Sequence, residues 1–397
     1  MKPYSTHPPE TTVLEDTKEF AALEEEWEDL YQDAPLATPF QSWAWLYSWW
    51  EFYGEGYELR LVTVRNEGVL VGIVPLMLKR RWGFGRLLFV GTGITDYLDM
   101  LARRGWEGYV SQAAREALWR MGYWHVVELH ELRPAAAAWG VFDGWAGPRT
   151  RMHLTGFDCP VIDVKPWDEL LMSLKRKIRY DVRRNVRRAD EDGVRCELVG
   201  PADAELAARR LVALNLEQWE ERGISPEALT RRFEAHLEAA ARRMTARDSG
   251  AISEVRLDGE AIASHFFVFG RDFVAEYMVG SGKESLRRYQ VSSLFIRDGL
   301  QLARQRNVAC LDLLRGEEPY KLRWTSKAVA NHRVILGRNL LFWGPYVGYR
   351  LLRSRARRFV EQEGTSPWIK TILNPFRGRR STHKSYSASR RQESGEK

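Results

Sequence analysis

A dense group of polar side chains follows a short apolar run in the last third of the chain. Leu311, Leu313 and Leu314 predict a buried strand, and Gly316 permits a tight turn directly after it. Acid–base and anion-binding side chains surround that turn: Asp312, Arg315, Glu317, Glu318, Tyr320, Lys321 and Arg323. The group indicates a site where carboxylates move protons and cations hold an anion, and a solvated, salt-bridged loop is the alternative.

The elements that position this group follow one another with short turns through the second half of the chain. Apolar spacing and turn residues predict, in order, helix 170–189, strand 194–199, helices 203–221 and 226–247, strands 251–257, 260–269 and 272–279, loop 280–290, helix 291–306, and strands 309–314 and 331–336. This order predicts a mixed α+β arrangement, in which a largely antiparallel sheet is flanked by helices.

The first half repeats a similar order in looser form. Helices are predicted over 17–31 and after Ser42, a plausible N-cap, and are followed by strands 58–65, 69–79, 86–90 and 96–101, helix 106–121 and strand 125–129. Residues 133–148, rich in Pro, Ala and Gly, read as a junction. A chain of 397 residues is long enough for two domains.

The net charge of +7 belongs to the end of the chain. Residues 349–397 contain thirteen Lys or Arg and four Glu, which gives +9 and leaves −2 for residues 1–348. A basic end suits anionic lipid or nucleic acid, whereas a slightly acidic body argues against a dedicated nucleic-acid module.

The spacing of the cysteines and the length of the apolar runs indicate the cellular compartment. Cys159, Cys196 and Cys310 are far apart and show no metal-ligand spacing, so we expect a reduced, cytoplasmic setting without a metal. No apolar run approaches the roughly 20 residues of a spanning helix, so we expect a protein that is soluble or peripheral to the inner membrane face.

Several segments resemble a known family. They are TPFQSWAWLYSWWE (38–51), the apolar stretch 61–78, TDYLDML (95–101), the basic helix 173–193, the strand pair 258–281 and DLLRGEEPYKLRW (312–324). With these segments the chain resembles the GNAT superfamily, in particular the CelD-like acetyltransferases associated with cellulose and polysaccharide biosynthesis, and more distantly the Fem-type peptidyltransferases. The resemblance implies tandem GNAT folds: a degenerate domain over 11–155, an acyltransferase domain over 160–336, and a basic, aromatic, partly disordered tail over 337–397.

The resemblance also implies a donor site at the junction between the third strand of the trio and the following helix. There Arg287 and Arg288 would pair with phosphates of acetyl-CoA or another acyl-CoA, and the backbone of Gln290, Val291, Ser292 and Ser293 would line the pocket. This junction contains no glycine, which departs from the family pattern. A serine-capped helix after a basic loop is the structural alternative.

Catalytic roles follow from the side chains that bracket this junction. Glu276 and Asp312 are candidates for the base, Tyr320 for donation to the leaving group and Lys321 for holding an anion. Candidate contacts to the acceptor are Arg315, Glu317 and His265. A lone strand histidine is more often a core residue, and a buried Asp312 needs a partner, for which Arg315 or Lys321 is nearest in sequence.

The function implied is acyl transfer from acyl-CoA to an amine or hydroxyl of a sugar or envelope precursor. One alternative is Fem-type transfer from aminoacyl-tRNA to a peptidoglycan precursor. Another is a non-catalytic protein that binds nucleic acid or a membrane surface, through the basic helix 175–188 or through the tail, whose aromatics adjoin an arginine run and suit an anionic membrane. The tail could equally be a helix packed on the domain.

Overall fold

The computed structural model describes residues 8–221, 230–316 and 318–362. Residues 1–340 form one compact unit, and residues 341–397 belong to a second. The mixed α/β class predicted from the sequence is confirmed. The predicted role of Glu317 and the part of the predicted tail (337–397) that follows residue 362 concern residues outside the described ranges.

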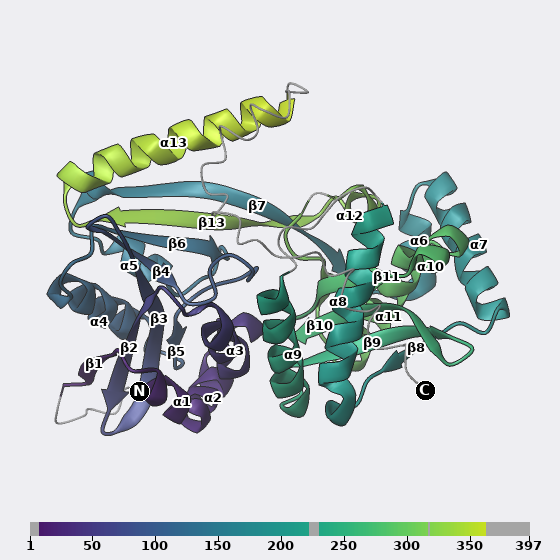
Figure 1. The fold of residues 1–397 in the computed structure, drawn as a ribbon, viewed down its shortest axis with the longest axis horizontal. Helices are drawn as coiled ribbons and strands as arrows, with labels where there is room; N and C mark the ends of the chain where they lie inside the picture. The colour runs from purple at the N-terminus through teal and green to yellow at the C-terminus, as the bar shows by residue number, and fades with distance from the viewer. Residues whose placement is uncertain (1–7, 222–229, 317, 363–397) are drawn as a thin grey trace, which may run out of the picture. The chain divides into compact units, whose positions relative to one another are not determined.

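Within the described residues, thirteen strands form one hydrogen-bonded sheet. Its order is β1-β2-β3-β4-β6-β13-β7-β12-β11-β10-β9-β8, and β5 pairs with β3 (Figure 1). The strands are β1 Glu10–Leu14, β2 Glu58–Asn66, β3 Val69–Arg81, β4 Phe84–Phe89, β5 Leu101–Ala102, β6 Val126–Leu132, β7 Arg151–Asp163, β8 Arg195–Leu198, β9 Gly250–Leu257, β10 Glu260–Phe269, β11 Phe273–Ser281, β12 Cys310–Asp312 and β13 Ala328–Gly337.

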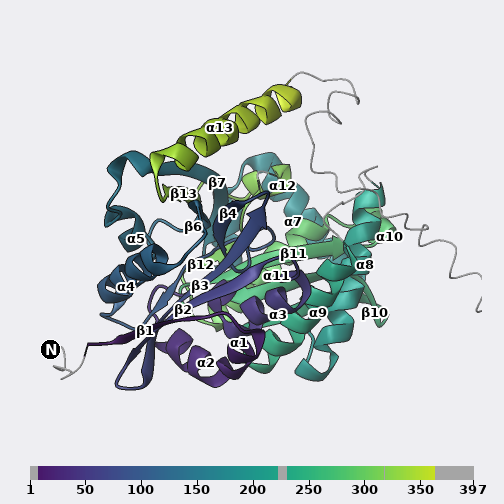
Figure 2. The same ribbon diagram turned by 60° about the vertical axis from the view of Figure 1, so that its left-hand side comes forward.

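Helices cover the sheet and bury two apolar clusters against it (Figures 1 and 2). The helices are α1 Thr17–Ala22, α2 Glu24–Asp33, α3 Trp43–Tyr53, α4 Glu107–Arg120, α5 Trp139–Asp143, α6 Trp167–Ser173, α7 Arg176–Glu191, α8 Ala204–Glu221, α9 Arg231–Ala246, α10 Lys283–Arg288, α11 Val291–Gln305, α12 Pro319–Leu322 and, in the second unit, α13 Leu340–Gln362. The larger cluster includes residues of both halves of the chain, which therefore share a core.

Two long strands join the halves of the sheet. β7 pairs with β12 and β13, while β13 inserts between β6 and β7 (Figure 1). The predicted domain boundary, between residues 155 and 160, lies within β7. The division into two GNAT-like domains stays a prediction. The strand β13, from near the end of the C-terminal half, completes the sheet of the N-terminal half, so the two halves share one sheet.

Local signals in the sequence explain several of these elements. Ser42 caps α3 as predicted, its hydroxyl accepting a hydrogen bond from the backbone N–H of Trp45 at 3.3 Å. Asp258 and Gly259 form the predicted turn between β9 and β10, with φ values of 51° and 83°. Both angles lie in the left-handed region that such two-residue hairpin turns require.

Other expectations about single elements are wrong. The strand predicted over 96–101 is irregular up to Met100, because the Asp99 carboxylate accepts hydrogen bonds from three backbone N–H groups and so competes with sheet pairing. The single helix predicted over 170–189 breaks at Leu174 and Lys175, whose ψ values of 154° and 142° are extended. Strands β1 and β7 were not predicted.

Candidate functional site

Asp312 ends β12 in a fully buried position. Its Oδ2 accepts a hydrogen bond from the hydroxyl of Tyr97 at 2.7 Å, and its Oδ1 accepts one from the backbone N–H of Leu314 at 2.8 Å. The expectation that Arg315 or Lys321 pairs with Asp312 is therefore wrong, because a tyrosine from the N-terminal half takes that place. Burial raises the pKa of Asp312 to about 6, which is close to neutral pH.

Arg315 lies at the centre of a buried ion cluster with Asp96 and Glu131. Its Nε is 3.0 Å from Asp96 Oδ1, and its Nη1 is 3.1 Å from Glu131 Oε1. Asn331 of β13 donates hydrogen bonds to the Asp96 carbonyl and to Glu131 Oε2. The Lys321 ammonium donates to the Arg315 carbonyl at 2.9 Å and pairs with Glu318. We call Asp96, Glu131, Arg315, Lys321 and Asn331 the Arg315 cluster.

The backbone beside this cluster adopts an uncommon conformation. Glu131 and Leu314 have φ values of 56° and 55°, in the left-handed region that non-glycine residues seldom adopt. At Leu314 the hydrogen bond to the Asp312 carboxylate supports this conformation. The surrounding contacts thus hold strained backbone in place at the end of β12.

His265 and Glu276 meet at a second buried position. The Nε2 of His265 is 2.8 Å from Asp298 Oδ2 on α11, and its Nδ1 is 3.3 Å from Glu276 Oε2 on β11. The hydroxyl of Ser253 also donates to Asp298, and the imidazole stacks on Phe295 at 4.4 Å. Burial disfavours the imidazolium, but the bonds to the two carboxylates outweigh it and raise the pKa of His265.

The predicted donor junction lies between α10 and α11, and its groups already have partners. The side chain of Asn185 on α7 accepts from the backbone N–H of Gln290 at 2.7 Å and donates to its carbonyl at 3.1 Å. The Arg288 guanidinium pairs with Asp192 at 2.8 Å, and the hydroxyl of Tyr289 donates to the same carboxylate. An anion at Gln290 would have to displace the chain's own contacts.

The other predicted junction residues differ in exposure. Arg287 is exposed on α10, whereas Val291 and Ser293 are buried in the first turn of α11. Ser292 is half-buried, and its hydroxyl accepts a hydrogen bond from Arg323 Nη2 at 2.6 Å. This bond connects the junction to the segment that follows α12.

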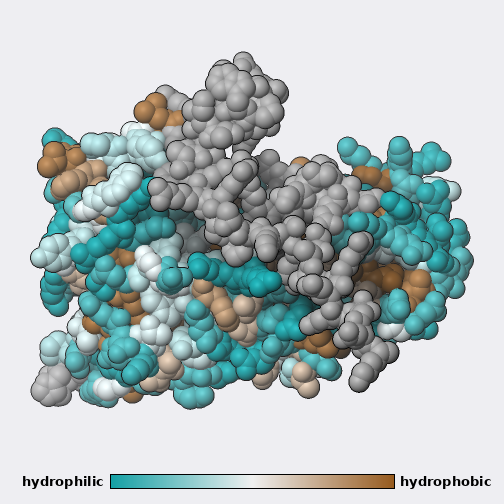
Figure 3. Space-filling model, viewed as in Figure 1, coloured by the Kyte–Doolittle hydropathy of each residue, from teal (hydrophilic) through white to brown (hydrophobic). Residues whose placement is uncertain are grey.

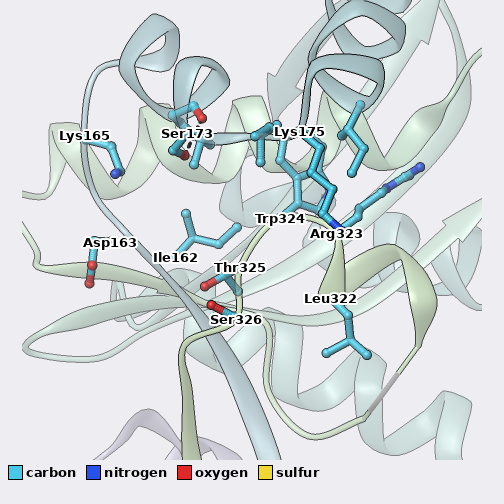
Figure 4. A pocket seen from close by; sticks show the side chains of 13 residues that line it. Ile162, Asp163, Lys165, Ser173, Lys175, Leu322, Arg323, Trp324, Thr325 and Ser326 are labelled. Carbon is cyan, nitrogen blue, oxygen red and sulfur yellow. Dashed lines mark hydrogen bonds between the residues drawn. The ribbon is translucent and has the colours of Figure 1, made fainter.

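A pocket of about 660 Å³ lies beside that segment. Its walls come from the end of β7, from α6, from the start of α7 and from residues 322–326 (Figure 4). The lining residues that bear on binding are Lys165, Ser173, Lys175, Arg323 and Trp324. In Figure 4, Lys165 lies on one side of the pocket and Lys175, Arg323 and Trp324 lie on the other. The break between α6 and α7 brings Lys175 to the rim. We call this pocket the Arg323 pocket.

The Arg323 pocket carries positive charge and unpaired donors. Within the described ranges, no carboxylate lies at ion-pair distance from Lys165, Lys175 or Arg323, and the single acidic lining residue, Asp163, pairs with Lys327. Burial lowers the pKa of Arg323, and the charge of Asp181, which is not at ion-pair distance, offsets this only in part. The buried Nε of Arg323 and Nε1 of Trp324 have no hydrogen-bond partner. These features fit an anionic ligand.

The predicted site residues therefore fall into three places. Asp312, Arg315 and Lys321 lie in or beside the Arg315 cluster, His265 and Glu276 lie together, and the residues from Arg287 to Ser293 form the junction. Tyr320 is half-buried on α12. None of the pocket cations was predicted as a ligand of the acyl donor. Lys175 belongs to the basic helix 175–188 and Arg323 to the polar group at the end of β12, so a sequence signal was available for both.

Comparisons with known proteins agree with this fold. Residues 176–322 match the family described as an acetyltransferase (GNAT) domain. Among solved structures, FemX superposes with a TM-score of 0.57 at 12% identity, covering 84% of this chain and 99% of FemX. L-PGS from Bacillus licheniformis gives 0.51 at 12% identity, covering 82% and 95%. A conserved protein of unknown function from Bacteroides thetaiotaomicron gives 0.53 at 8% identity, covering 82% and 100%.

A search of curated sequences finds no match. At these identities the structural likeness concerns the fold alone. The matched region runs from α7 to α12 and contains the junction and the His265 position, whereas Lys165, Lys175 and Arg323 of the pocket lie just outside it. The chain thus has a GNAT-like acyltransferase fold, and residues 176–322 are similar to the GNAT acetyltransferase domain family.

Proposed function

We propose that this protein transfers an acetyl or other acyl group from acyl-CoA to an amine or hydroxyl of a sugar or envelope-polysaccharide precursor. The main support is the Arg323 pocket, which offers three cations beside the start of α11 and, at Arg323 Nε and Trp324 Nε1, buried donors without a partner. The phosphates of coenzyme A are anions that such groups bind. The resemblance to CelD-like acetyltransferases supplies the acceptor class.

The reaction needs a proton acceptor close to the attacking group. As the acceptor nitrogen or oxygen bonds to the acyl carbon, the carbon–sulfur bond breaks, and the proton of the acceptor passes to a base. We assign this proton to Asp312, whose pKa of about 6 suits a base near neutral pH and whose carboxylate is positioned by Tyr97. Tyr320 is the proposed donor to the leaving thiolate. Glu276, bound to His265, is the second candidate base.

The residues proposed to bind the donor phosphates differ from those expected from the sequence. Arg315 and Lys321 are engaged by carboxylates and carbonyls of the chain, and Arg288 by Asp192. We therefore place the donor phosphates with Lys165, Lys175 and Arg323.

A donor and acceptor panel tests this function. The full chain is incubated with acetyl-CoA or longer acyl-CoAs and with amino sugars, nucleotide-linked sugars or oligosaccharides, and free thiol is measured. We expect acceptor-dependent thiol release that Lys175→Met reduces about tenfold, while Lys177→Met, an exposed change outside the pocket, has little effect. No thiol release with any acceptor would refute the proposal.

The closed junction and the likeness to FemX favour a second candidate, Fem-type transfer from aminoacyl-tRNA. In that case the Arg323 pocket would hold phosphates at the end of the charged tRNA. Transfer of a radiolabelled amino acid from tRNA to a peptidoglycan precursor, without CoA turnover, would establish this alternative in place of the first.

A further inference from the structure

The helix of the second unit has an exposed apolar stripe. Leu341, Pro345, Gly348 and Leu352 lie at the i, i+4, i+7 and i+11 positions of α13, on one face of the helix. Leu341 and Leu352 are 74% and 68% exposed, and the neighbouring Tyr349 is 46% exposed. Figure 3 shows hydrophobic atoms along the described part of this helix. Such a stripe indicates a binding surface, because contiguous exposed apolar patches on soluble proteins mark interaction sites more often than single exposed leucines do.

The sequence of the same helix changes from apolar to basic along its length. Residues 340–349 carry no charged side chain, whereas Arg350 begins a run of five arginines in nine positions. At about 1.5 Å per residue a helix of this length could cross a bilayer. Even so, among the described helices none combines sufficient length with the apolar character that a membrane span needs. An apolar stripe next to an arginine run is instead the pattern of a helix that lies in a membrane interface.

We propose that α13 binds the surface of an anionic lipid bilayer, with Leu341, Tyr349 and Leu352 inserted among the acyl chains. This inference is independent of the proposed function. The charge of the region agrees with it, because residues 349–397 carry +9 while the rest of the chain carries −2. Arginines near an anionic surface add electrostatic attraction to the apolar contact.

Two other occupants fit the same residues less well. A second copy of the chain would bring two strongly positive segments together, and their repulsion opposes pairing along this stripe. Nucleic acid would engage the arginines but would leave the exposed leucines in water. A bilayer accounts for both the stripe and the charge.

Vesicle binding by the full chain tests the proposal. Co-sedimentation is measured with vesicles of phosphatidylcholine alone and of phosphatidylcholine mixed equally with phosphatidylglycerol, at low and high salt. We expect binding to the anionic vesicles that weakens with salt, and the double change Leu341→Glu with Leu352→Glu should lower the partition coefficient about tenfold or more.

The matched control is Leu206→Glu, which changes another exposed helical leucine, in α8. It should leave vesicle binding within about twofold, since it lies outside the stripe. Thermal unfolding of both variants should match the wild type. Failure to bind anionic vesicles would overturn the proposal, as would equal binding by the double variant. A loss of self-association in the double variant, seen by sedimentation velocity with vesicle binding unchanged, would make the stripe a subunit interface instead.

Discussion

Arg315 and Arg323 are eight residues apart in the same polar group, yet their surroundings differ. Arg315 is held by two buried carboxylates and donates to the Gly93 carbonyl. Arg323 has one neutral partner, the Ser292 hydroxyl, and lines an open pocket. The first arginine is satisfied by the chain itself, and the second retains hydrogen-bonding capacity for a ligand.

The difference shows that partners from distant parts of the chain decide which polar residues remain available. Glu131 lies 184 residues before Arg315 in the sequence, and Asp96 lies 219 residues before it. Their carboxylates neutralise the guanidinium of Arg315. Nothing comparable reaches Lys165, Lys175 or Arg323 within the described part of the chain. Substitution of Arg315 should therefore lower the stability of the fold, whereas substitution of Arg323 should weaken ligand binding.

The largest expected effect is on folding stability. Arg315→Met leaves Asp96 and Glu131 buried without their cation, so it should lower the free energy of unfolding by about 3–5 kcal/mol. Urea unfolding measures this loss. Arg120→Met, which removes an exposed ion pair with Glu116, should cost less than about 1 kcal/mol. Similar losses in both variants would contradict the structural role of the Arg315 cluster.

The next effect is a dependence of stability on pH. Because burial raises the folded-state pKa of Asp312 to about 6, the folded protein binds a proton more tightly than the unfolded chain. The resulting stabilisation is complete below about pH 4 and is lost as the pH rises through about 6, a change of roughly 3 kcal/mol.

Unfolding free energies from pH 4 to 7 should therefore decline less steeply in Asp312→Asn than in the wild type. Tyr97→Phe keeps the carboxyl but removes its hydroxyl donor, so this variant should decline more steeply. Parallel profiles for all three proteins would show that Asp312 does not titrate in this range.

A smaller effect concerns the Arg323 pocket. Arg323→Met should weaken binding of the acyl donor about tenfold and change the free energy of unfolding by less than about 1 kcal/mol, because no buried carboxylate depends on this arginine. Calorimetric titration and urea unfolding measure the two quantities. Arg304→Met, exposed on α11, is the control for charge. A loss of stability as large as that of Arg315→Met would remove the contrast between the two arginines.

The smallest effect is expected at the connection between pocket and junction. Ser292→Ala removes the hydroxyl that accepts from Arg323, at a cost of about 0.5–1 kcal/mol. Donor affinity should change no more than about threefold, since the guanidinium remains in the pocket. An effect equal to that of Arg323→Met would assign the binding role to the serine hydroxyl.

Local patterns predicted most of the sheet and helices because they depend on neighbouring residues. The turn-bounded runs of β9 to β11 and the apolar stripe of α11 are such patterns. The long strand β7 was missed because Gly156, Asp158 and Pro160 interrupt its apolar pattern. Its pairing with β12 and β13 supplies what local propensity lacks.

The candidate site was less predictable for the same reason. The polar group at 312–323 is visible in the sequence, but its division into a closed cluster and an open pocket depends on Asp96, Tyr97 and Glu131, which no spacing rule links to it. The clamp of Asn185 on Gln290 is equally non-local. Residue types indicated the chemistry, and tertiary contacts determined which residues are free to perform it.

The position of β13 between β6 and β7 has a consequence during synthesis. Until residues 328–337 leave the ribosome, β6 and β7 each lack the strand that lies between them, so both present unpaired edges. About 170 residues follow β7 before β13 is complete, which takes roughly 10–30 s at translation rates of about 5–20 residues per second. During that interval the nascent N-terminal half is the form most exposed to aggregation, and a chaperone that covers strand edges should increase the yield of folded protein.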